Sequence, residues 1–225
     1  MADYRLGVDV GGTHTDLVLA NPATGALEIE KVQSTPSNPS IAVLDGTRRL
    51  LARGIGPEEI DFFSHATNAL LEMKGAKVGL LITKGFRAIQ EVQSQAREGN
   101  QFKLKFRRAK ALVPQRLTRE IGGRIGYTGE EVDPLDEEDI RRAVSELRDE
   151  GVVSFAVCYI FSFMNEGHER RTAEIIREEA PGAFVSLSSD VLSRIREWPR
   201  MSTTLLNAYL EPVLTRYCAD LDGGL

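Results

Sequence analysis

The hydrophobic and polar residues of this chain form two kinds of pattern, and the pattern of the first 32 residues predicts strands. A nearly continuous apolar run at residues 4–10 is typical of a strand buried on both faces. After a short polar interruption, apolar runs resume at 16–20 and 27–32, the last two separated by turn-forming residues at 21–25. Three successive strands joined by tight turns predict an antiparallel meander.

The remainder of the chain predicts helices and strands in alternation. A cap at Asn38 followed by Pro39, with apolar residues at helical spacing up to Gly54, predicts a first helix. The same spacing predicts helices at 137–150, 166–180 and 202–221, the last bent at Pro212. Other predicted elements are strands at 61–64, 77–83, 117–125, 152–161 and 183–187, short helices at 68–74 and 85–93, and an irregular segment at 94–114. Strand–helix–strand alternation implies parallel pairing. The predicted class is therefore α/β, with a mixed sheet that starts with the meander and continues in strand–helix–strand units.

Composition narrows the range of partners. The 225 residues carry a net charge of −5, and the 28 basic and 33 acidic residues are mixed along the chain. This gives no electrostatic case for nucleic acid or a membrane surface as a partner. The one basic run, residues 103–110, is either a phosphate- or RNA-binding patch or, as is commoner for such runs, a solvated loop face. The absence of a long uncharged apolar segment predicts a cytoplasmic protein, and Cys158 and Cys218 are expected to be buried free thiols.

The most specific candidate for a functional site lies at the turn between the first two predicted strands, where residues 9–16 read Asp-Val-Gly-Gly-Thr-His-Thr-Asp. Two adjacent glycines let the backbone approach a ligand and present consecutive N–H groups to a phosphate oxygen. The hydroxyls of Thr13 and Thr15 can add donors. Asp9, at the end of a buried strand, suits a hydrated Mg²⁺, which prefers carboxylate and phosphate oxygens.

The alternative interpretation of this motif is a plain Gly-Gly hairpin turn. Rossmann and P-loop sites are excluded by the spacing, since the glycines lead into a strand and not a helix. A buried strand, Asp-x-Gly-Gly-Thr and an antiparallel strand resembles the first phosphate loop of the actin and sugar-kinase superfamily. The wider phrase at 7–16 resembles the hydantoinase/oxoprolinase family, which usually has Phe where His14 stands. The resemblance continues through blocks at residues 34–36, 38–40, 66–72, 84–87, 112–114, 134–138, 156–158, 168–171 and 202–210.

The resemblance implies a fold, an activity and cofactors. It implies an actin-like (ribonuclease H-like) ATPase lobe, with an N-terminal domain at residues 1–188 and the helical start of the following ATPase region at 189–225. It further implies ATP and Mg²⁺ as cofactors, and a small cyclic amide such as 5-oxoproline or a hydantoin as substrate. Phosphorylation of the amide carbonyl oxygen would let water open the ring. No catalytic residue is assigned. The implied metal ligand is Asp9, the implied phosphate cradle is Gly11, Gly12 and Thr13, and further cofactor-binding candidates are His14, Thr15 and Asp16.

Two departures from the family pattern are a shortened loop after His65 and the histidine at position 14. The family usually reads His-Gly-Thr-Thr-Val-Ala-Thr-Asn, whereas here His65 is followed directly by Ala66-Thr67-Asn68, so four residues of a polar loop are missing. His65, Thr67 and Asn68 stand where the family keeps polar residues near the substrate, but they could equally cap a strand-to-helix junction. His14 either contacts a phosphate or metal, or fills the space of the usual Phe.

A third departure is the single phosphate loop. The superfamily clamps ATP between two lobes, each with an Asp-Gly-rich loop, and no second such loop follows residue 16. We therefore expect weak ATP binding and little turnover by the chain alone, and a requirement for a second hydantoinase/oxoprolinase subunit or a C-terminal lobe. A truncated non-catalytic binding or regulatory module and a ketone-carboxylase subunit, which would phosphorylate an enol, stay open as alternatives. A sugar-kinase relative would share only the first loop.

Overall fold

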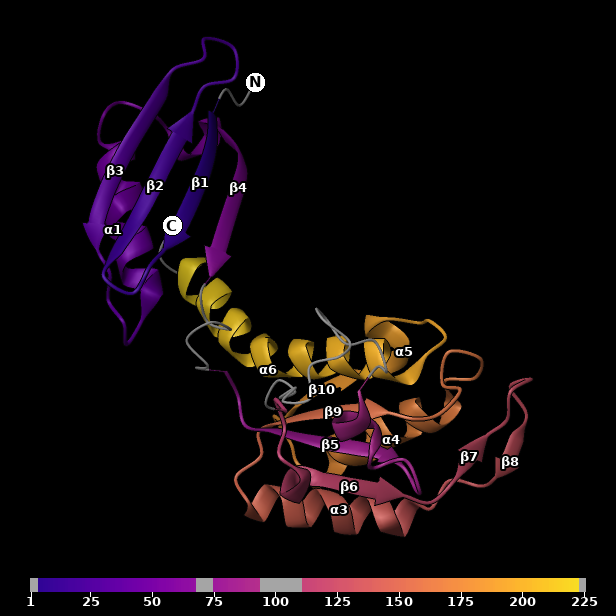
Figure 1. Cartoon of the computed structure of the whole chain (residues 1–225). Helices are drawn as coiled ribbons and strands as arrows, with labels where there is room; N and C mark the ends of the chain where they lie inside the picture. Colours follow the sequence, from indigo (N-terminus) through magenta and orange to yellow (C-terminus); the bar gives the residue numbers. More distant parts are fainter. Residues whose placement is uncertain (1–3, 68–74, 94–110, 223–225) are drawn as a thin grey trace, which may run out of the picture. The chain divides into compact units, whose positions relative to one another are not determined.

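The computed structural model describes residues 4–67, 75–93 and 111–222 and divides the chain into two compact units. The first unit comprises Met1–Gly75 together with Val213–Leu225, and the second comprises Ala76–Pro212. Each unit contains one four-stranded sheet with helices packed on it (Figure 1). The fold is therefore α/β with more than one sheet. The predicted helix at 68–74, the basic run at 103–110 and all but the last residues of the irregular segment lie outside the described residues.

The sheet of the first unit has the order β3-β2-β1-β4 (Figure 1). Its strands are β1 (Tyr4–Val10), β2 (His14–Ala20), β3 (Leu27–Gln33) and β4 (Ile60–Thr67). The first three pair antiparallel in chain order, whereas β4 runs parallel to β1. The β2–β3 turn is closed by the Asn21 side chain, which accepts from the N–H groups of Ala23 and Thr24. This sheet is thus mixed, with its only parallel pair at β1 and β4.

One helix covers one face of this sheet. Helix α1 (Pro39–Leu51) begins with proline at its first position, and the Asn38 side chain caps it by accepting from the N–H of Ser40 at 3.1 Å. It contacts β1, β2 and β3, and a 3₁₀ turn (Pro57–Glu59) then leads into β4. The buried core of this unit consists of Leu6, Val8, Val10, Leu17, Leu19, Val32, Ala42, Val43, Leu50 and, from its C-terminal segment, Tyr217. Alternate residues of β1, β2 and β3 therefore face α1, and the residues between them lie on the opposite face.

The second unit is built on a parallel sheet of order β10-β9-β5-β6 (Figure 1). Its strands are β5 (Val78–Thr83), β6 (Thr118–Ile121), β9 (Ser154–Cys158) and β10 (Phe184–Leu187), and β7 (Arg124–Ile125) pairs with β8 (Glu131–Asp133) in a separate hairpin. Its helices are α2 (Ile89–Val92), α3 (Glu137–Asp149), α4 (Gly167–Glu179), α5 (Ser188–Val191) and the first part of α6 (Glu197–Asp222), with a 3₁₀ turn at Gln115–Leu117. Helices α3 and α4 contact each other, and Figure 1 shows α3 and α6 on opposite faces of the sheet.

Three features of this unit differ from the sequence prediction. The strand–helix–strand segments form a sheet of their own and do not extend the meander into one mixed sheet. The predicted strand at 117–125 is two strands, because Gly123 adopts φ +118° and a Cβ there would lie 2.8 Å from the Cα of Leu135. Helix α6 begins at Glu197, five residues before the predicted start at Ser202.

A buried carboxylate joins three segments of the second unit. Glu169, in the first turn of α4, is 0% exposed. One of its oxygens accepts from the N–H of Tyr159 at 2.9 Å and from the hydroxyl of Ser188 at 2.6 Å, and the other accepts from the N–H of Ser189 at 2.9 Å. Buried carboxylates cost free energy unless they are hydrogen-bonded in this way. Glu169 therefore fixes the end of β9 and the start of α5 to α4.

The two thiols are expected to react at very different rates. Cys158 lies buried at the end of β9, where burial, followed by the nearby charge of Glu169, raises its pKa far above the usual thiol range. Cys218 is exposed, so the prediction that it is buried was wrong. Because the thiolate is the reactive form, the native chain should react with a thiol reagent at Cys218 and react at Cys158 at least about 100-fold more slowly. Peptide mapping after timed alkylation measures both rates, and comparable rates for the two would contradict the burial of Cys158.

Candidate functional site

The glycine-rich turn between β1 and β2 is a tight loop of three residues, Gly11, Gly12 and Thr13. It is closed by the N–H of Gly11, which donates to the carbonyl oxygen of His14 at 2.9 Å. A Cβ on Gly11 would lie 2.8 Å from that same oxygen, closer than real Cβ contacts come. Glycine at position 11 is therefore required by the close approach of the two backbone segments.

A serine at the end of β3 holds this loop in place. The N–H of Ser34 donates to the carbonyl of Thr13 at 2.9 Å, and the Ser34 hydroxyl donates to the carbonyl of Gly11 at 2.7 Å. Since the only hydroxyl proton of Ser34 is used there, the Thr15 hydroxyl donates its own proton to Ser34 Oγ at 2.9 Å. Sequence reasoning missed Ser34 as part of the site. The available signal was that it opens the block at 34–36 that resembles the family.

The Ser34 contacts change the interpretation of Thr15. Thr15 is 0% exposed and lies on the sheet face that packs against α1. Its hydroxyl contacts Ser34 Oγ, so Thr15 braces the loop from the buried face of the sheet. Its predicted place among the donors to a phosphate stays a prediction. The residues above it are exposed, namely Gly12, Thr13 and His14. His14 consequently fills no buried space in the first unit, in contrast to the packing role that a Phe-like residue would have.

Two backbone donors of the loop have no internal acceptor. In the part of the chain that the structure describes, the N–H groups of Gly12 and Thr13 donate to no protein atom. Both belong to exposed residues, so water satisfies them in the free chain. Adjacent exposed N–H groups of this kind form a cluster of donors that suits a phosphate oxygen.

Two carboxylates face each other beside the loop. Asp9 of β1 is directly opposite Asp16 of β2 in the antiparallel register, and both lie on the sheet face away from α1. Asp16 forms an ion pair with Lys31 of β3 at 2.8 Å. Asp9 is exposed, and among the described residues it has no cationic partner. No group of three or more metal-ligating His, Cys, Asp or Glu side chains occurs in the described ranges. A cation at Asp9 would therefore need further ligands from water or a bound phosphate.

The predicted substrate residues are placed only by their backbone. Strand β4 runs parallel to β1, with His65 beside Val8 and Thr67 beside Val10, so β4 ends next to the start of the loop. The predicted cap at Thr67 is thus the last residue of a strand. Asn68 lies outside the described residues. The register therefore brings His65 and Thr67 to the same end of the sheet as the loop.

Removing the Ser34 hydroxyl is expected to loosen this loop. Ser34→Ala deletes the bond to the Gly11 carbonyl and the acceptor of Thr15, and a single hydrogen bond is worth about 1 kcal/mol. Amide hydrogen exchange of the peptides that span 4–20 should then accelerate about fivefold. Ser37→Ala is the matched control, because Ser37 is exposed and forms no side-chain hydrogen bond among the described residues. Equal exchange in the two variants would show that Ser34 does not hold the loop.

The family of the chain follows from comparison with known sequences. The family described as the hydantoinase/oxoprolinase N-terminal region matches residues 5–180. The chain belongs to this family. The matched region includes the loop, both carboxylates, Ser34 and the whole of β4, so the site described above lies inside the region shared with hydantoinase/oxoprolinase proteins.

The chain is similar to proteins whose names state an activity. The chain is 39% identical to the caprolactamase subunit alpha of Pseudomonas jessenii over 97% of its own length and 33% of that protein. It is 34% identical to the acetophenone carboxylase gamma subunit of Aromatoleum aromaticum, covering 92% of this chain and 31% of that one. The crystal structure of the ATP-dependent caprolactamase from P. jessenii matches 97% of this chain and 33% of that one, with 36% identity and a TM-score of 0.81.

The chain spans about a third of the length of the relatives it matches in these comparisons. Within the described ranges, no helix combines the length and the apolar character needed to cross a membrane.

Proposed function

We propose that this chain contributes the first phosphate-binding loop of an ATP-dependent enzyme that opens a cyclic amide, by phosphoryl activation of the amide carbonyl. The observation that carries the proposal is the loop at residues 11–13, whose two unpartnered N–H groups lie beside the exposed carboxylate of Asp9. Similarity to a caprolactamase subunit and to an ATP-dependent caprolactamase structure supports the use of ATP and the lactam substrate class.

The residues around the loop fit a magnesium–nucleotide complex. Asp9 supplies the carboxylate that Mg²⁺ prefers, and phosphate oxygens would complete its ligands, as is usual for this ion. The N–H groups of Gly12 and Thr13 and the Thr13 hydroxyl are the proposed phosphate donors, and Gly11 gives the loop its shape. Bound Mg²⁺ would neutralise charge on the phosphate groups. His14 is an exposed neighbour of this cradle, and Asp16 holds Lys31 beside it.

The proposal also includes the fold superfamily of the first unit and the domain boundaries of the chain. We interpret the first unit as part of an actin-like (ribonuclease H-like) ATPase lobe, supported by the antiparallel order of β1, β2 and β3 with the loop between the first two strands. The division into an N-terminal domain at 1–188 and the start of a following ATPase region at 189–225 stays a prediction. It is supported by the end of the family match at residue 180.

The proposal further names residues for substrate contact and a partner subunit. His65, Thr67 and Asn68 remain the candidates for substrate contact, supported by the register that brings β4 beside the loop. A partner is proposed because the relatives include an alpha and a gamma subunit, and the chain spans a third of them. Similarity to a ketone-carboxylase subunit at 34% identity makes phosphorylation of an enol the second candidate function. A cytoplasmic location is part of the proposal, supported by the free thiols of both cysteines.

The function is tested by nucleotide-dependent turnover. ADP formation should be measured for the chain with and without candidate partner subunits, with ε-caprolactam, 5-oxoproline, hydantoin or acetophenone as the added substrate. The proposal expects ADP release that depends on a cyclic amide, on the partner and on Asp9. Release with acetophenone and bicarbonate but with no cyclic amide would favour the carboxylase alternative. An unchanged rate of ADP release in the Asp9→Asn variant would contradict the proposed site.

A further inference from the structure

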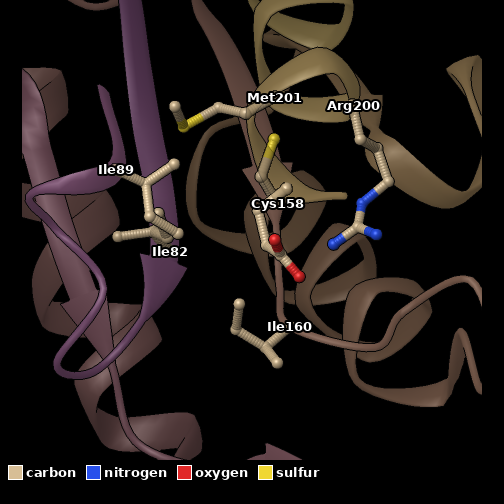
Figure 2. A pocket seen from close by; sticks show the side chains of 7 residues that line it. Ile82, Ile89, Cys158, Ile160, Arg200 and Met201 are labelled. Carbon is tan, nitrogen blue, oxygen red and sulfur yellow. The ribbon is translucent and has the colours of Figure 1, made fainter. Parts of the chain in front are cut away.

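The cavity of the second unit is too small for any ligand larger than water. Figure 2 shows the side chains that line it, including Ile82, Ile89, Cys158, Ile160, Arg200 and Met201. Its volume of about 10 Å³ holds one water molecule. An exposed row of charges in the first unit is a better candidate for binding.

This row crosses three strands beside the glycine loop. Asp9 of β1 is directly opposite Asp16 of β2, and Asp16 is in turn directly opposite Lys31 of β3. All three side chains lie on the sheet face away from α1. The charges along the row are therefore negative, negative and positive, and Asp16 stands between a second carboxylate and an ammonium group.

The middle carboxylate has two possible cationic partners. Directly opposite side chains of an antiparallel pair have Cβ atoms about 4.5–5.5 Å apart, so Asp9 and Asp16 can both reach one divalent ion. In the structure Asp16 is bound to Lys31 instead, with 2.8 Å between Nζ and Oδ1. Since this ammonium neutralises Asp16, an ion that arrives at Asp9 meets one free carboxylate and not two.

The number of free carboxylates decides how well the site holds an ion on its own. The affinity of oxygen sites for divalent ions rises with the number of charged ligands, and Mg²⁺ in particular is usually held by one or two carboxylates together with the phosphates of a substrate. A site with one free carboxylate thus depends on the phosphate oxygens of a nucleotide. The ion pair that imposes this dependence is at the surface, with Lys31 58% and Asp16 44% exposed.

We propose that Lys31 is a positioning residue of the metal site: by holding Asp16, it leaves Asp9 as the single free carboxylate, so that the divalent ion binds together with the nucleotide and not ahead of it. This inference rests on the proposed magnesium–nucleotide site. Lys31 acts through Asp16 and needs no contact with the ion.

Binding of the metal alone tests the role of Lys31. Mn²⁺ takes the same oxygen ligands as Mg²⁺, and the electron paramagnetic resonance signal of the free ion reports how much is bound. Without nucleotide, Lys31→Gln should bind Mn²⁺ about tenfold more tightly than the wild-type chain, because Asp16 becomes available. The double variant Lys31→Gln/Asp16→Asn should return to the wild-type affinity. An unchanged affinity in Lys31→Gln, or a gain that persists in the double variant, would overturn the proposal.

Arg5→Gln is the matched control for the change in net charge. Arg5 is exposed on the same face of β1 and forms no ion pair with a carboxylate of the described residues. At an ionic strength of about 0.15 M its removal should change the Mn²⁺ affinity less than about twofold, because salt screens separated surface charges. A gain in Arg5→Gln equal to that in Lys31→Gln would show a general charge effect and refute the specific role of Lys31.

Repeating the titration with ADP separates this inference from the proposed site. The ratio of Mn²⁺ affinities with and without ADP should fall about tenfold in Lys31→Gln, a change that a merely structural role of Lys31 would not produce. An equal gain with and without ADP would contradict the proposed coupling. If Asp9→Asn weakens Mn²⁺ binding with ADP but Lys31→Gln gains nothing without it, the site stands and the role of Lys31 is refuted. If Asp9→Asn binds Mn²⁺ and ADP like the wild type, the proposed site itself fails.

Discussion

Asp9→Asn is expected to reduce magnesium-dependent nucleotide binding by about 100-fold, because the attraction between a carboxylate and an adjacent divalent ion contributes roughly 2–4 kcal/mol. The change keeps the shape of the side chain and removes its charge. Isothermal titration of the chain with ADP, with and without Mg²⁺, measures the effect. Asp45→Asn is the matched control, since Asp45 is in the same unit and forms a surface ion pair with Arg49 at 2.7 Å.

A stability measurement separates this role from a structural one. Asp9 stands directly opposite Asp16, and like charges in that arrangement repel. Without Mg²⁺, Asp9→Asn should therefore leave the first unit equally stable or stabilise it by up to about 1 kcal/mol. Loss of both binding and stability would indicate that Asp9 supports the fold. Unchanged binding would remove the basis for a metal at this position.

Replacing Glu169 by leucine is expected to destabilise the second unit by about 3–5 kcal/mol, the range found when one member of a buried charged network is removed. The substitution leaves the N–H groups of Tyr159 and Ser189 and the hydroxyl of Ser188 without their acceptor. It also removes the carboxylate that the Ser188 hydroxyl links to the buried Arg200 guanidinium.

Urea unfolding followed by tryptophan fluorescence measures this effect in the unit concerned, because the only tryptophan lies in the second unit. Glu174→Leu is the matched control. It lies on the same helix, but its side chain is 58% exposed and is paired at the surface with Arg171, so it should change the midpoint little. Similar shifts for the two variants would contradict the account of the buried network.

Local sequence signals predicted much of the secondary structure. Apolar runs placed the strands of the meander within two residues of their observed bounds, since burial sets their periodicity. Helix α1 was marked by Asn38 and Pro39, whose effects act within one turn. The position of the glycine loop between two strands also followed from the sequence, because Gly11 and Gly12 interrupt an otherwise apolar pattern.

Contacts between distant segments could not be predicted in this way. Ser34 holds the loop only because β3 ends beside the β1–β2 turn, and that depends on strand register and not on local composition. Glu169 is one of many acidic helix residues, and it is buried only because α4 meets the end of β9 and the start of α5, whose groups hydrogen-bond to it. The break at Gly123 likewise arises from the approach of Leu135, twelve residues later in the chain. Periodicity identifies elements, whereas the site depends on how their ends meet.

The most direct measurement of the central claim is a backbone amide NMR titration of the chain with ADP and Mg²⁺. The account predicts that the amide signals of Gly12 and Thr13 shift most, that the shifts require Mg²⁺, and that they disappear in Asp9→Asn. Shifts centred on another part of the chain, or shifts at these two amides that persist without Mg²⁺ and in Asp9→Asn, would contradict it.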